Sequence, residues 1–93
     1  MSIIRLHDRK IGHNNPTFII AEIGINHQGN IEIAKSLISK ALECGADAVK
    51  FQKRSITRIL TRDGLSMPYI NNNSFGETYG EHKKALELSK SDY

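Results

Sequence analysis

Residues 18–52, FIIAEIGINHQGNIEIAKSLISKALECGADAVKFQ, decide the fold. The run FIIAEIG (18–24) is apolar except for Glu22, which is typical of a strand buried on both faces of a parallel sheet. Apolar residues then recur at helical spacing over 31–42, and AVKFQ (48–52) has the pattern of a second short strand. Strand, helix and strand in this order form a βαβ unit. The sequence therefore predicts an α/β fold.

The segments around this unit are expected to be less regular. Residues 3–6 and 10–11 look like two short strands joined by a polar turn, and Pro16 then interrupts the chain. Residues 53–76 form a long connection of mixed character, and connections of this length in an α/β unit are usually functional. A helical pattern resumes at Thr78. We therefore expect a hairpin, one βαβ unit and a long loop before a further helix.

Composition excludes several classes of protein. The chain has 93 residues, 13 Lys and Arg against 10 Asp and Glu, and a net charge of +3, which is ordinary for a globular domain. No apolar run approaches the roughly 20 residues of a membrane-spanning helix, and residues 1–10 lack the apolar stretch of a secretory signal. Cys44 has no intrachain partner, which excludes disulfide frameworks and thiolate zinc sites. We therefore expect a cytoplasmic protein that does not insert into membranes.

A candidate site lies where the two expected strands end, since working residues in βαβ folds gather at the carboxyl ends of the strands. Period-two alternation places Glu22, Lys50 and Gln52 on one face, opposite the apolar face that suits a covering helix. Parallel strands lie about 4.8 Å apart, so these three side chains are expected to be neighbours. The structural alternative is a buried Glu22–Lys50 ion pair, but desolvation makes such pairs weak contributors to stability. We therefore interpret the trio as a functional site.

Cations are concentrated after the second strand. Five lie between residues 50 and 66 against one acid: Lys50, Lys53, Arg54, Arg58 and Arg62 against Asp63. A solvated loop is the simplest explanation on composition alone, but the first three look like an anion clamp. Binding to nucleic acid would call for aromatic residues between the cations, and the nearby Phe51 is expected on the other face. We therefore expect a small phosphorylated or carboxylated ligand and no nucleic acid.

The turn GINHQG (24–29) has the glycine spacing of a phosphate-binding loop but lacks the Lys-Ser/Thr that should follow, so it does not indicate nucleotide binding. The helix start at Asn30 still offers free N–H groups to an anion. His27 is a candidate ligand or base, although a lone histidine in a loop is usually neither. Asn26 and Arg54 are further candidates for the site.

Three motifs together resemble the N-acetylneuraminate (sialic acid) synthase family. IAEIGINHQG (20–29) and GADAVKFQ (45–52) resemble its first two strands, and FGETYGEHK (75–83) with LELS (86–89) is similar to its next helix. The resemblance implies that residues 16–93 are the first two βα units, the second incomplete, of a (β/α)8 TIM-type barrel. Residues 1–15 would be a hairpin or leader. Typical barrels need about 250 residues, so residues 1–93 would be an N-terminal fragment of a barrel domain.

The resemblance also implies a reaction. The full-length enzyme would condense phosphoenolpyruvate with an N-acetylated hexose, N-acetylmannosamine, to give a sialic acid and phosphate. Lys50 and Gln52 would then hold phosphoenolpyruvate, and Glu22 would act near the reacting carbons or the attacking water. The resemblance implies a divalent metal, Mn²⁺ or Mg²⁺, that polarises the aldehyde, with ligands on later strands and none in this chain. It further implies a homodimer for the full-length protein.

Two alternatives stay open from the sequence. The first is a sister synthase for another nonulosonic acid, such as legionaminic or pseudaminic acid. The second is a non-enzymatic, anion-binding fragment, and the isolated 93-residue chain is expected to have no turnover.

Overall fold

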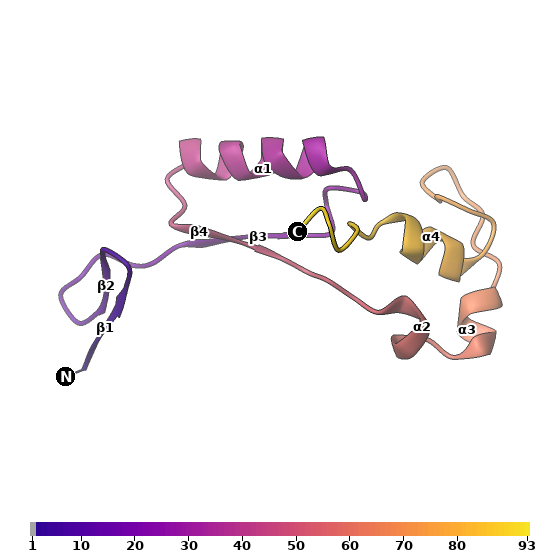
Figure 1. The fold of residues 1–93 in the computed structure, drawn as a ribbon, viewed down its shortest axis with the longest axis horizontal. Helices are drawn as coiled ribbons and strands as arrows, with labels where there is room; N and C mark the ends of the chain where they lie inside the picture. Colours follow the sequence, from indigo (N-terminus) through magenta and orange to yellow (C-terminus); the bar gives the residue numbers. More distant parts are fainter. Residues whose placement is uncertain (1) are drawn as a thin grey trace.

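The computed structural model describes residues 2–93, and Met1 lies outside the described part. The chain has a mixed α/β fold, with two separate two-stranded sheets among the described residues (Figure 1). No helix within residues 2–93 is long and apolar enough to cross a membrane. In chain order the elements are β1 (Ile3–Leu6), β2 (Arg9–Gly12), β3 (Ile20–Gly24), α1 (Ile31–Glu43), β4 (Ala48–Phe51), α2 (Ile56–Ile59), α3 (Arg62–Ser66) and α4 (Tyr79–Ala85).

The predicted βαβ unit is confirmed. β3 and β4 pair in parallel, with Glu22 opposite Lys50, and a register shift follows between Glu22 and Gly24. The connecting helix α1 lies along one side of the pair (Figure 1). Its N-cap is Asn30, whose side chain accepts hydrogen bonds from the N–H groups of residues 32 and 33. Gly45 follows the helix with φ +88°, the left-handed conformation expected of a C-terminal glycine.

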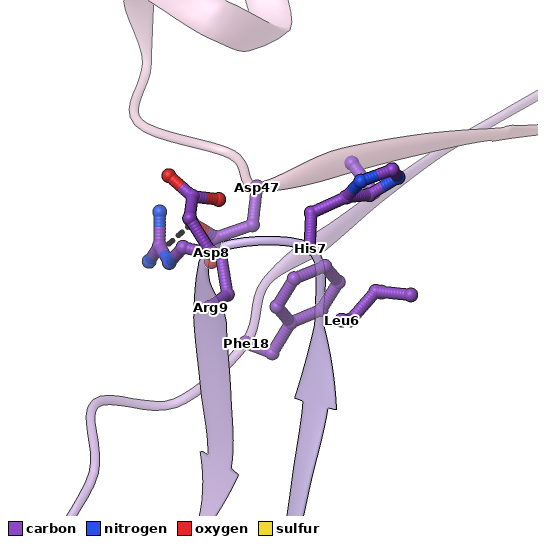
Figure 2. Close-up of a pocket in the computed structure, with 7 residues that line it drawn as sticks. Leu6, His7, Asp8, Arg9, Phe18 and Asp47 are labelled. Carbon is purple, nitrogen blue, oxygen red and sulfur yellow. Dashed lines mark ion pairs between the residues drawn. The ribbon is translucent and has the colours of Figure 1, made fainter.

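The first two strands, β1 and β2, form the expected hairpin. The hairpin contacts the amino-terminal ends of β3 and β4. Figure 2 shows Arg9 reaching Asp47, with which it forms an ion pair. The Asp47 carboxylate also accepts a hydrogen bond from the N–H of Ile19, at 2.8 Å. Because Asp47 directly precedes β4 and Ile19 directly precedes β3, this carboxylate ties both strands to the hairpin. The hairpin therefore does not cover the opposite, carboxyl-terminal ends of β3 and β4.

The chain beyond β4 runs through α2 and α3, then through a loop to α4, and finally returns toward the end of β3 (Figure 1). The loop is closed by a bridge between Pro68 and Thr78. Thr78 also caps α4 in a reciprocal capping box with Glu81. After α4, the side chains of Leu86 and Leu88 are buried, at 7% and 3% exposure. Leu88 lies beside Ile31 and Ala34 of α1 and Phe51 of β4, so the returning segment lies against the βαβ unit.

A cluster of aromatic residues surrounds His82 of α4. The His82 ring is 8% exposed and lies 4.5 Å from the ring centroid of Tyr69. Its Nδ1 accepts a hydrogen bond from the backbone N–H of Phe75, at 3.1 Å. Burial lowers the pKa of His82 from its ordinary value of 6.5, and the nearby cations Lys83 and Arg54 lower it further. The loop before α4 therefore donates a hydrogen bond to an uncharged imidazole.

We expect acid to destabilise this loop through His82. The folded-state pKa lies below the unfolded value of 6.5, so the unfolded chain binds the proton more readily and stability falls as the pH drops below that value. The measurement is amide hydrogen exchange over residues 67–78 in the purified protein, at about pH 7.5 and about pH 5. His82→Phe, which cannot titrate, should lose this component of the pH dependence. Equal pH dependence in both proteins would contradict the assignment.

Candidate active site at the carboxyl ends of β3 and β4

The structure brings Glu22 and Lys50 together. The Lys50 Nζ lies 2.7 Å from Glu22 Oε2, and the two side chains are 65% and 54% exposed. An ion pair as open as this contributes at most about 1 kcal/mol to stability, so it is not the buried structural pair that was the alternative. Separating the two side chains to admit a ligand therefore costs little free energy. The pair therefore has the properties of two site groups that neutralise one another when no ligand is bound.

Gln52 lies just past the end of β4. Its backbone N–H donates to the Gly24 carbonyl oxygen at 3.1 Å, which extends the pairing of the two strands by one link. Its side chain is exposed, and continued alternation along the strand would put it on the same face as Lys50. Asn26, in the turn after β3, is also exposed. Glu22 and Lys50 are thus paired on an exposed face at the strand ends, and the place of the Gln52 side chain beside them stays a prediction.

The prediction that Lys50, Lys53 and Arg54 together form an anion clamp is wrong, because two of the three side chains have other partners. Arg54 is held by Glu87, which accepts hydrogen bonds from the Arg54 Nε at 3.1 Å and from its backbone N–H at 3.0 Å. The two side chains are 15% and 14% exposed. Lys53 instead lies over the ring of Tyr93, with its Nζ 5.4 Å from the ring centroid. Of the three cations, Lys50 is the one that faces Glu22.

His27 lies behind the trio and not within it. Its side chain is fully buried, and its Nδ1 accepts a hydrogen bond from the Gly29 N–H at 3.0 Å. Its ring lies 5.8 Å from that of Phe51, which faces α1. Its Nε2 has no hydrogen-bond partner among the described residues. An unpaired buried donor costs about 1–3 kcal/mol, so a histidine here is not explained by stability alone.

The sequence did not single out Gln28, which lines a polar cleft of about 420 Å³ together with residues of the loop before α4. The loop residues that line it are Asn72, Asn73, Ser74 and Phe75. Both contributors lack regular secondary structure, so no periodicity in the sequence could have paired them. Among residues 2–93 no three His, Cys, Asp or Glu side chains gather as metal ligands. The described residues at the strand ends therefore offer acidic, cationic and amide groups.

A parallel βαβ unit with an exposed acid–cation pair at its strand ends defines an α/β protein with a candidate ligand site where such folds bind their ligands. Residues 37–93 match the model of the NeuB family. The chain belongs to the NeuB family, as its resemblance to sialic acid synthases predicted.

Several relatives of this chain are named as synthases of sialic acids and related acids. The chain is 52% identical over 85 residues to N-acetylneuraminate-9-phosphate synthase of Mus musculus, covering 91% of this chain and 24% of that protein. It is 42% identical over 83 residues to N,N'-diacetyllegionaminic acid synthase of Legionella pneumophila, covering 88% and 23%. A crystal structure of N-acetylneuraminic acid synthetase from Leptospira borgpetersenii superposes with a TM-score of 0.69 at 33% identity, covering 98% of this chain and 27% of that one. The chain spans about a quarter of the length of these relatives.

Proposed function

We propose that the polypeptide carrying this chain is a synthase that condenses phosphoenolpyruvate with an N-acetylated hexosamine, giving a sialic acid and inorganic phosphate. Residues 16–93 would form the first two βα units of its (β/α)8 barrel. The observation that carries the proposal is the open Glu22–Lys50 pair at 2.7 Å, at the strand ends of a NeuB-family chain. The activities after which its relatives are named support the reaction class.

Lys50 and Gln52 would bind phosphoenolpyruvate. The ligand carries a carboxylate and a phosphate, and its oxygens would replace Glu22 as partners of the Lys50 ammonium. A charge-assisted hydrogen bond of this kind contributes about 1.5–3 kcal/mol, more than the exposed pair it replaces. The Gln52 amide N–H, on the same face, would donate to a second oxygen and fix the orientation of the ligand.

Binding of the ligand to Lys50 would leave the Glu22 carboxylate free to act on the reacting centre. The C3 carbon of phosphoenolpyruvate forms a bond to the aldehyde carbon of the sugar, whose oxygen takes up a proton. Water adds at C2, and the bond from C2 to the phosphate oxygen breaks to release inorganic phosphate. Glu22 would orient the water and accept its proton, as a general base within hydrogen-bond reach.

A divalent metal, Mn²⁺ or Mg²⁺, belongs to the proposal for the full-length polypeptide only. When bound it would polarise the sugar aldehyde. Its ligands are proposed to lie outside residues 1–93. By the same family resemblance, the full-length polypeptide is proposed to be a cytoplasmic homodimer.

The acceptor is proposed to be N-acetylmannosamine, and the mouse and human relatives direct attention to its 6-phosphate. Their product is phosphorylated at C9, and because phosphoenolpyruvate supplies three carbons, that phosphate corresponds to C6 of the sugar. The Legionella relative makes the sister synthase the second candidate, with a diacetylated acceptor.

The test is phosphate release by the purified full-length polypeptide with phosphoenolpyruvate, Mn²⁺ and each acceptor in turn. We expect release that depends on N-acetylmannosamine or its 6-phosphate, with a product whose mass equals the sum of sugar and pyruvate units. Release with a diacetylated sugar alone would select the sister synthase. No release with any acceptor would contradict the proposed function.

A further inference from the structure

His27 connects the β3–α1 turn to the end of β4. Its side chain accepts the Gly29 N–H, and its backbone carbonyl accepts the Asn30 N–H at 3.0 Å. Asn30 in turn caps α1. The ring of His27 packs on Phe51. One buried residue thus contacts the turn, the start of α1 and the last residue of β4.

The contact with Phe51 matters because of where Phe51 stands in the chain. It lies between Lys50 and Gln52. Its ring lies with residues of α1, whereas the exposed Lys50 side chain pairs with Glu22, and alternation would place Gln52 on the side of Lys50. A shift of the Phe51 ring toward α1 would therefore draw both site residues with it. Across the strand pair, Glu22 is held by β3, which leads directly into the turn that His27 closes. His27 is placed to set the spacing between the two halves of the site.

We propose that His27 is a positioning residue, which locks the β3–α1 turn against Phe51 and so holds Lys50 and Gln52 in register with Glu22. The inference rests on the proposed function, because the alignment of these three residues matters for catalysis only if they bind phosphoenolpyruvate. Because Nδ1 accepts the Gly29 N–H, the ring proton resides on Nε2, which is buried and has no partner among the described residues. Phenylalanine would fill the same space without burying that donor. The group that distinguishes histidine from a simple core residue is therefore the Nδ1 acceptor.

The test compares three substitutions in the full-length polypeptide. His27→Phe keeps the ring and removes the acceptor, His27→Asn keeps an acceptor near the Nδ1 position, and His27→Gln places its amide near Nε2. We expect His27→Phe and His27→Gln to raise KM for phosphoenolpyruvate about tenfold or more and to leave KM for the sugar within about twofold. His27→Asn should recover most of the loss. His13→Phe, at an exposed histidine near the hairpin, is the matched control.

A second measurement does not depend on turnover. The Gln52 N–H, which donates to the Gly24 carbonyl, should exchange with solvent about tenfold faster in His27→Phe than in the wild type. Unchanged exchange at Gln52 together with an unchanged KM for phosphoenolpyruvate would overturn the proposal. If His27→Phe does not fold, His27→Asn and His27→Gln test the positioning role. Equal KM values for phosphoenolpyruvate in these two variants would overturn the proposal. If the wild type releases no phosphate, the proposed function fails, and the exchange at Gln52 still decides the positioning role.

Discussion

Replacing Lys50 by alanine in the full-length polypeptide should lower kcat/KM for phosphoenolpyruvate about 10³-fold. The side chain supplies the cation that faces Glu22 on the open side of the strand pair. Its removal takes away charge-assisted hydrogen bonds worth about 1.5–3 kcal/mol each in binding, and it leaves the Glu22 carboxylate to repel an anionic ligand. Steady-state phosphate release at varied phosphoenolpyruvate measures the loss. Turnover close to that of the wild type would remove Lys50 from the site.

Lys53→Ala is the matched control for this variant. Lys53 carries the same charge three residues on, but it lies over the ring of Tyr93, whereas Glu22 is paired with Lys50. An exposed cation–π contact contributes about 0.5–1 kcal/mol, so we expect kcat/KM to change less than about tenfold. The exposed Glu22–Lys50 pair also adds little to folding, so neither variant should shift the urea midpoint appreciably. A similar loss in both variants would indicate a general effect of charge and not a site at Lys50.

The pairing of Glu22 with Lys50 could be predicted because it follows from short-range rules. Alternation along each strand fixes which residues share a face, and a parallel βαβ unit brings the two carboxyl ends together. The register shift after Glu22 comes too late to disturb this pair. The N-cap at Asn30 and the termination of α1 at Gly45 likewise depend on local backbone chemistry. These features were available in the sequence.

The surroundings of the trio could not be predicted in the same way. Arg54 was expected to bind an anion, but Glu87 lies 33 residues further on and binds it instead. No periodicity connects these positions, because the path of the chain through α2, α3 and α4 brings them together. The packing of His27 on Phe51 has the same origin, as does the ion pair between Arg9 and Asp47. Local patterns thus indicate the groups of a site, and tertiary contacts decide which of them remain available.

Gly29→Ala should destabilise the full-length polypeptide by about 3 kcal/mol or more. Gly29 has φ +71°, and a Cβ there would overlap the Ala85 carbonyl oxygen at the end of α4. A left-handed alanine costs about 1–2 kcal/mol, and forcing two backbone segments apart costs about 1–3 kcal/mol. The neighbouring carbonyl of Glu87, 3.3 Å from the same Cβ, leaves little room for the segment to move aside. Urea unfolding of the purified protein measures the change.

Gly45→Ala separates the two causes, because Gly45 has a similar φ of +88° and a Cβ added there would meet no atom within 4 Å. Only the conformational cost applies there, about 1–2 kcal/mol. Gly29→Ala should therefore lower the urea midpoint well beyond Gly45→Ala, and it should also speed the exchange of the amides that follow α4. Equal shifts in the two variants would mean that the returning segment does not press on the β3–α1 turn. A larger shift at Gly29 would establish that the turn beside the site is held in place by the segment after α4.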